Sequence, residues 1–148
     1  MSLKQQLQED LKGALRARDE RCKSVIRMAL AAITNAEVEH GGEFDDAGVT
    51  TVLQKQARQR RDTIAELRRA NRPESLANEE AELAILEKYL PRPLSREEIA
   101  EEARHVIAEA GATGMGQIGT VMRQLMSKLK GRADGRVVNE VVREMLSG

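Results

Sequence analysis

Two groups of basic side chains have the types and positions needed to bind phosphate. In the first group, four arginines are spaced three, seven and four residues apart and so share one face of a helix: Arg58, Arg61, Arg68 and Arg72. The second group surrounds Gly131 and consists of Lys128, Lys130, Arg132 and Arg136. Basic side chains beside the free backbone N–H groups of a helix start form a suitable phosphate site. Both groups are therefore candidate contacts for nucleic acid.

Each group also has an ordinary structural interpretation. The segment after the first group is acidic, with Glu74, Glu79, Glu80, Glu82 and Glu87. Two oppositely charged helix faces would attract each other in a hairpin, or each would simply be solvated. The second group would equally be cations at the end of one helix, followed by an ordinary turn. The sequence leaves both interpretations open.

Arg60 differs from the other arginines because it lies in the middle of an apolar stripe. That stripe consists of Leu53, Ala57, Ile64 and Leu67. A buried guanidinium needs a charged partner, since an unpaired buried charge is very costly. We therefore predict a carboxylate partner for Arg60, with Glu82 and Glu37 as the candidates.

The segment Gly114–Gly119 matches the dinucleotide pattern G-x-G-x-x-G. That pattern binds a cofactor only at a strand-to-helix turn inside a βαβ unit. Here a predicted helix precedes it, and no hydrophobic strand is evident. We expect these glycines to permit a tight turn between helices and close packing of the backbone.

No arrangement typical of a catalytic or metal site is found. Cys22, His40 and His105 lie in different predicted elements and lack the spacing of metal ligands. The sequence has no nucleophile elbow, no complete Ser-x-x-Lys set and no P-loop. The prediction is therefore a chain with no catalytic residues, no metal and no cofactor.

The elements that carry these residues are all predicted to be helices. Only Phe44 and Tyr89 are aromatic and tryptophan is absent, so aliphatic side chains must fill the core, which suits helix packing. Leucines at 3, 7, 11 and 15 predict a first helix, and Asp19 is expected to cap a second that ends near Gly41. Two further helices are predicted at about 47–71 and 75–90.

Pro91 and Pro93 exclude helix and predict an extended link between two domains, 1–90 and 94–148. After the link, Ser95 and Glu98 form a capping box for a helix that ends at Gly111. The segment from Gly114 opens the next helix, and Asp134 caps the last. The predicted fold is thus all-α, with a four-helix N-terminal module, a proline-rich link and a small three-helix module.

Composition narrows the class of protein only partly. The 24 basic and 24 acidic residues give a net charge of zero, so overall charge does not favour nucleic acid. With so few aromatic residues, an RNA would have to be bound through its backbone and shape rather than by base stacking.

The compartment is predicted to be the cytoplasm. The single cysteine, Cys22, cannot form an internal disulfide, which fits a reducing environment. The first ten residues lack an apolar leader segment, and the uncharged stretch 110–122 is too short to span a membrane.

Several segments together resemble the YqeY family. They are Ile26-Arg27-Met28 through Asn35-Ala36-Glu37, residues 52–56, residues 59–62, Tyr89-Leu90-Pro91 and the block Lys130–Gly135. The segment Gly116–Met122 also resembles the family, and departs from its pattern at Gln117-Ile118-Gly119. That family is similar in helical architecture to the tail domain of the GatB subunit of glutamine-dependent aspartyl/glutamyl-tRNA amidotransferase. The resemblance implies a GatB-tail-like C-terminal module and the family label of carbon–nitrogen ligase with glutamine as amido-N-donor.

The leading hypothesis is a non-catalytic accessory protein that binds tRNA or associates with tRNA-modifying or aminoacylation enzymes. In the amidotransferase the chemistry belongs to other parts of the enzyme, and the tail is associated with tRNA contact. One alternative is an amidotransferase activity of the chain itself. The other is a protein-interaction adaptor whose third helix docks an acidic partner.

Overall fold

The computed structural model describes residues 1–129 and 131–148, and all regular secondary structure in those ranges is helical. The all-α prediction is confirmed. Lys130, one of the four residues of the second basic group, lies outside the described residues. The rest of the chain falls into two compact units, Met1–Leu90 and Pro91–Gly148, which we call the N-terminal and C-terminal units.

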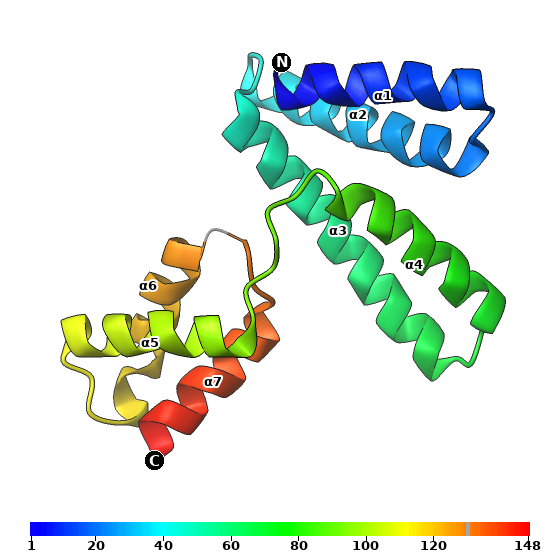
Figure 1. Ribbon diagram of the computed structural model, residues 1–148. Helices are drawn as coiled ribbons and strands as arrows, with labels where there is room; N and C mark the ends of the chain where they lie inside the picture. The colour runs from blue at the N-terminus through cyan, green and yellow to red at the C-terminus, as the bar shows by residue number, and fades with distance from the viewer. Residues whose placement is uncertain (130) are drawn as a thin grey trace. The chain divides into compact units, whose positions relative to one another are not determined.

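The N-terminal unit consists of two helical hairpins (Figure 1). Its elements are α1 (Leu3–Ala17), α2 (Glu20–His40), α3 (Asp46–Arg69) and α4 (Pro73–Glu87). Helices α1 and α2 pack side by side, as do α3 and α4, and α2 also contacts both α3 and α4. The two hairpins therefore meet mainly through α2.

Local capping signals account for the ends of these helices. The Asp19 side chain accepts a hydrogen bond from the Cys22 N–H at 3.0 Å, as predicted, and so caps α2. Gly41 ends α2 in the left-handed conformation with φ 89°. Pro73 occupies the first turn of α4, where its missing N–H costs nothing because that N–H would have no partner within the helix.

The core of the N-terminal unit lies where α1, α2, α3 and α4 face one another. Its buried residues are Leu7, Val25, Ile26, Ala29, Ile33, Val49, Leu53 and Leu86. Leu15, placed on the inner stripe by its spacing, is 45% exposed, and Ala14 is buried in its stead. Because residues four apart advance by about 40° beyond one full turn, three such steps carry Leu15 roughly 120° from Leu3.

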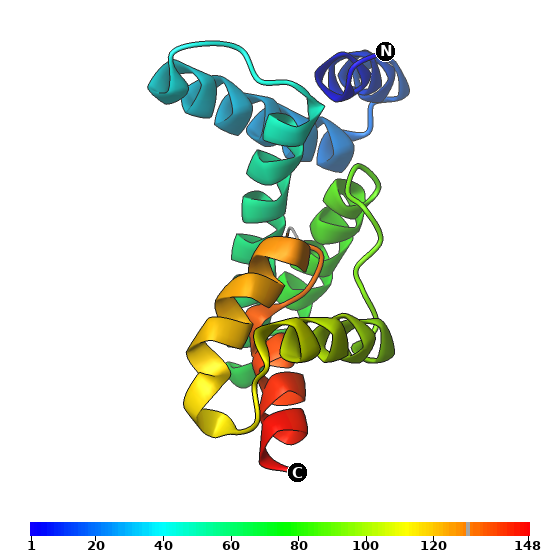
Figure 2. The ribbon, with the colours of Figure 1, turned by 90° about the vertical axis from the view of Figure 1, so that its left-hand side faces the viewer.

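The C-terminal unit is a cluster of three short helices (Figure 2). Its elements are α5 (Arg96–Ala110), the 3₁₀ turn η1 (Met115–Gln117), α6 (Ile118–Leu129) and α7 (Gly135–Ser147). Each helix contributes to one core, made of Ile99, Ala103, Val106, Val121, Leu125, Leu129, Val138, Val141, Val142 and Leu146. The valines hold α7 by burial, which offsets their modest helix propensity.

The glycine-rich segment Gly114–Gly119 joins α5 to α6 through η1, so it does not follow a strand. The expectation of close backbone packing was wrong, because a methyl group added at Gly114, Gly116 or Gly119 would meet nothing within 4 Å. The turn is held instead by Gln117, whose side-chain oxygen accepts the backbone N–H of Gly114 at 3.2 Å. The segment is thus a helix-to-helix connection.

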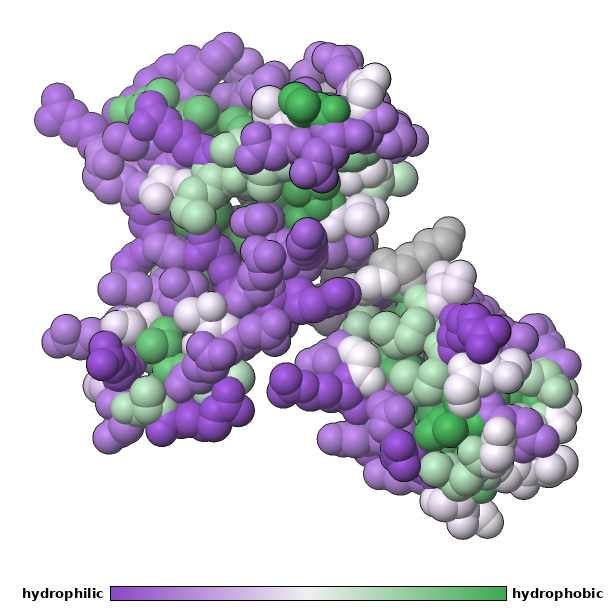
Figure 3. Space-filling model, turned by 180° about the vertical axis from the view of Figure 1, so that it is seen from behind, coloured by the Kyte–Doolittle hydropathy of each residue, from purple (hydrophilic) through white to green (hydrophobic). Residues whose placement is uncertain are grey.

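Polar residues cover most of the visible face of the N-terminal unit in Figure 3, and the hydrophobic residues between them form small groups. The visible face of the C-terminal unit shows more apolar and intermediate residues. Among the residues that the structure describes, no helix is long and apolar enough to cross a membrane.

Candidate functional site

Three members of the first basic group lie along α3, and two of these form ion pairs with α4. The prediction that Arg72 shares their helix face was wrong, because α3 ends at Arg69 and Arg72 lies in the turn as the N-cap of α4. Arg61 Nη2 lies 3.7 Å from Glu87 Oε1, and Arg68 Nη2 lies 3.1 Å from Glu80 Oε1. Arg58 and Arg72 are exposed and have no ion pair within the described ranges. Attraction between the two oppositely charged faces therefore accounts for two of the four arginines, and two remain free.

Arg60 is buried in the same hairpin, at 9% exposure, and has the carboxylate partner that its position predicted. Its Nη1 contacts Glu82 closely and lies 3.3 Å from Glu79 Oε2. The other candidate, Glu37, was wrong. Glu37 lies near the end of α2, beside the start of α3, whereas Arg60 comes 14 residues after Asp46, about 21 Å further along the helix.

Glu37 is buried and has partners of its own in the N-terminal unit. Its Oε1 lies 2.7 Å from Lys4 Nζ, and its Oε2 accepts the Phe44 N–H at 2.8 Å. These contacts, the Lys4 hydrogen bond first, lower the pKa of the Glu37 carboxyl. The ionised carboxylate thus ties the start of α1 to the loop between α2 and α3.

Two members of the second basic group line one groove in the C-terminal unit. This groove of about 410 Å³ lies between α5 and the end of α6, and Lys128 and Arg132 line it together with Glu98, Glu101 and Glu102. Lys128 Nζ lies 3.0 Å from Glu102 Oε2. Arg136 lies in the first turn of α7, exposed, and the structure shows no ion pair for it among the described side chains.

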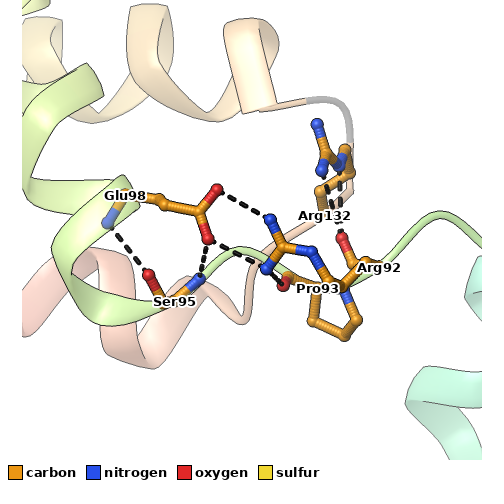
Figure 4. A network of polar contacts seen from close by, with 5 residues as sticks. All are labelled: Arg92, Pro93, Ser95, Glu98 and Arg132. Atoms are coloured by element: carbon orange, nitrogen blue, oxygen red, sulfur yellow. Dashed lines mark hydrogen bonds and ion pairs between the residues drawn. The ribbon is translucent and has the colours of Figure 1, made fainter.

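Arg132 takes part in a polar network that holds the beginning of the C-terminal unit (Figure 4). Its Nε and Nη2 donate to the Arg92 carbonyl at 3.3 and 3.2 Å, and its own carbonyl accepts the Leu94 N–H at 2.8 Å. Arg92 in turn forms two 2.9 Å hydrogen bonds with the Glu98 carboxylate. We call Arg92, Ser95, Glu98 and Arg132 the linker network.

Of the linker network, the sequence predicts only the Ser95–Glu98 capping box and not the contacts of Arg92 and Arg132. The contact between Arg92 and Arg132 joins residues 40 positions apart, so no periodic pattern marks it. One local signal was available, however. Arg92 precedes Pro93, which favours an extended conformation, so its carbonyl is not used within a helix and is available to a donor from elsewhere in the fold.

A family model described as Yqey-like protein matches residues 4–146, which is nearly the whole chain. The chain belongs to the YqeY family. The resemblance seen in the sequence is thereby confirmed at the level of the family.

Curated relatives are similar to this YqeY-family chain over most of its length. A protein of Pyrenophora tritici-repentis named Altered inheritance of mitochondria protein 41, mitochondrial, is 31% identical over 142 residues, covering 95% of this chain and 78% of the relative. Proteins of the same name in Saccharomyces cerevisiae and Lachancea thermotolerans are 30% and 33% identical, over 83% and 70% of this chain and 68% and 57% of the relatives.

The names of these relatives overturn the prediction of a cytoplasmic location, because they are mitochondrial proteins by name. The prediction rested on the single cysteine and on the lack of an apolar leader. A single cysteine fits a reducing compartment in general and does not separate the cytoplasm from the mitochondrion.

Cys22 and Tyr89 lie outside the Arg60 cluster and the linker network, and both have raised pKa values. Burial, and then Asp19, raise the pKa of the Cys22 thiol, which keeps it protonated and a weak nucleophile. Burial, and then a hydrogen bond to Asp10, raise the pKa of Tyr89. In residues 1–129 and 131–148, no three His, Cys, Asp or Glu side chains are grouped to hold a metal ion.

Acid is expected to weaken the linker network of this YqeY-family chain. The hydrogen bond from Arg92, and then the Ser95 N–H, lower the pKa of Glu98 to about 2. A carboxyl with a depressed folded pKa contributes stability above its unfolded pKa of about 4.3, and that contribution is lost as the pH falls toward the folded value. Between about pH 4.3 and 2, the melting temperature of the wild type should therefore fall by more than the melting temperature of Glu98→Gln. Identical acid profiles for the two proteins would contradict this assignment.

Proposed function

We propose that this chain is a non-catalytic accessory protein that binds tRNA or associates with tRNA enzymes, and that its C-terminal unit contacts the RNA. The observation that supports the proposal is the position of three cations around the end of α6 and the start of α7. Lys128 and Arg132 line one groove, and the exposed Arg136 lies one short turn away. Phosphate binding at such a helix start is physically favourable.

The carboxylates of the same groove do not oppose this function strongly. Glu98 is paired with Arg92, Glu101 with Arg104 and Glu102 with Lys128. Each carboxylate thus has a cation beside it, which leaves Arg132 and Arg136 as the uncompensated positive charges. Since Arg132 also holds the linker network, Lys128 and Arg136 are the better residues for testing RNA contact.

The double variant Lys128→Gln/Arg136→Gln is expected to weaken tRNA binding and its dependence on salt. Each phosphate contact contributes about −0.7 to −0.9 to the slope of log affinity against log salt, so the double variant should flatten that slope by roughly 1 to 2. Fluorescence anisotropy of labelled bulk tRNA, measured over a range of salt concentrations, gives both quantities.

The matched control is Arg58→Gln/Arg72→Gln, which removes the two arginines of the first basic group that form no ion pair within the described residues. If only the control weakens binding, the contact lies on the N-terminal unit rather than on the C-terminal unit. If wild-type protein does not bind tRNA at low salt, the proposal is wrong.

A second candidate is the adaptor function, and two arginines of the first basic group, Arg58 in α3 and Arg72 at the start of α4, are the observation that favours it. Both side chains are exposed and form no ion pair within the described residues, so they are free to bind an acidic partner. Capture of a partner that survives nuclease treatment, and that is lost in Arg58→Gln/Arg72→Gln, would favour this function over RNA binding. Glutamine-dependent amidotransfer is less well supported, because the sequence has neither a P-loop nor a nucleophile elbow.

We also propose that residues 1–90 and 94–148 act as separate domains, the second of them similar to the GatB tail. The C-terminal unit has a core of its own built from α5, α6 and α7, which supports this division.

A further inference from the structure

A small polar groove in the N-terminal unit is not part of the proposed RNA contact. It has a volume of about 280 Å³ and lies where α2, α3 and α4 meet. Met28 comes from α2, Gln56, Gln59 and Arg60 come from α3, and Glu79 and Glu82 come from α4. The groove thus combines one exposed thioether with charged and amide side chains.

The charges in this groove do not balance. Arg60 supplies one positive charge, whereas Glu79 and Glu82 supply two negative charges and both contact the same nitrogen, Nη1. Each carboxylate uses Oε2 for that contact and is 27% exposed. The Oε1 atoms have no hydrogen-bond partner among the described residues and remain able to accept hydrogen bonds from a ligand.

The second edge of the Arg60 guanidinium is also incomplete. Its side chain is nine-tenths buried, yet Nε has no hydrogen-bond partner among the described residues. The contact of Nη2 on this edge is with Met28 Sδ at 3.9 Å, and a thioether is a weak acceptor. The Nε and Nη2 hydrogens of a guanidinium point in parallel and together suit an oxygen acceptor. Leaving them without one costs free energy in the unbound protein.

Met28 lies over this edge, at which Nε has almost no solvent exposure. The side chain is 54% exposed. Methionine is unbranched and changes rotamer easily, so it can move aside and pack against a ligand. A ligand with an aliphatic part would therefore gain an apolar contact at the rim of the groove.

We propose that this groove binds a basic side chain of a partner polypeptide. The ammonium or guanidinium group donates hydrogen bonds to Glu79 and Glu82, and a main-chain carbonyl of the same segment accepts from the Nε–Nη2 edge of Arg60. The methylene stem of the basic side chain packs on Met28. The surplus negative charge disfavours a phosphate or a carboxylate, and a neutral amide would leave that charge uncompensated. The ligand class is therefore a lysine or arginine within a peptide.

The probe for this site is N-acetyl-arginine methylamide, titrated into the full chain. We expect saturable NMR shifts of the Arg60 Nε–H and the Met28 methyl signals, with a dissociation constant roughly in the millimolar range for so small a ligand. N-acetyl-glutamate methylamide should give no saturable shift, and N-acetyl-alanine methylamide a much weaker one. Equal binding of the glutamate probe, or no saturable shift of the Arg60 signal with the arginine probe, would overturn the proposal.

Two neighbouring residues of α4 provide matched variants. Glu79→Gln keeps the Arg60–Glu82 pair, removes the surplus charge and should weaken arginine binding roughly fivefold to tenfold. Glu80→Gln makes the same change one residue away, in the exposed pair with Arg68, and should leave the affinity unchanged. Equal losses in both variants would show non-specific attraction and refute a defined site. Circular dichroism of each variant confirms that the helices are intact before titration.

Discussion

Replacing Arg60 by alanine is expected to lower the free energy of unfolding of the N-terminal unit by about 2–3 kcal/mol. The substitution leaves Glu79 and Glu82 with no cation in a partly buried site and opens a cavity beside the apolar stripe of α3. Removal of one partner from a buried pair is costly because the remaining charge stays desolvated. The two glutamates are partly exposed and can turn toward water, so the loss falls below that of a fully buried pair.

Arg68→Ala is the control for this prediction, since Arg68 pairs with Glu80 in the same hairpin but on its exposed side. An exposed pair contributes little, so this variant should change stability by less than about 1 kcal/mol. Urea unfolding followed by far-ultraviolet circular dichroism compares the two variants. Equal small effects would mean that the Arg60 cluster contributes no more than a surface pair.

The second large effect is expected from Leu125→Ala in the C-terminal unit. Leu125 is fully buried in the core formed by α5, α6 and α7. Truncation of a buried leucine costs about 3 kcal/mol, and a core in a domain of this size supplies only about 3–5 kcal/mol in total. We therefore expect α5, α6 and α7 to unfold while α1 to α4 remain folded.

Amide hydrogen exchange measured by mass spectrometry would locate this unfolding. In Leu125→Ala, peptides from 96–147 should lose protection, and those from 3–87 should keep it. Leu53→Ala, a fully buried leucine of the N-terminal core, should give the opposite pattern. Loss of protection throughout the chain in both variants would show that the units unfold together, and would count against separate domains at 1–90 and 94–148.

Features that depend on neighbouring residues could be predicted from the sequence. The Asp19 cap, the Ser95–Glu98 capping box and the left-handed Gly111 are each formed within one helical turn, and all three are present. The burial of Arg60 could also be predicted, because it interrupts an apolar stripe at a position where the helix must face the core. The acidic residues of the next helix then supplied its partner.

Features that depend on three-dimensional approach could not be predicted in the same way. The spacing of Leu15 fitted a stripe of leucines four residues apart. Four residues rotate a helix by slightly more than one full turn, however, so the Leu15 side chain lies toward solvent. Lys4 and Glu37 come from different helices, 33 residues apart, and nothing local links them. Charge patterns marked both basic groups in the sequence, but only the fold shows that Arg61 and Arg68 are paired and that Arg132 binds a carbonyl.

The hydrogen bond between Tyr89 and Asp10 has a practical consequence for spectroscopy. Tyr89 is the sole tyrosine, the sequence has no tryptophan, and the one phenylalanine, Phe44, is also in the N-terminal unit. A carboxylate that accepts the phenol proton quenches tyrosine emission, so intrinsic fluorescence should rise when this contact opens. The C-terminal unit emits nothing of its own. A tryptophan introduced at a partly buried position such as Met126 would give each unit a separate optical signal.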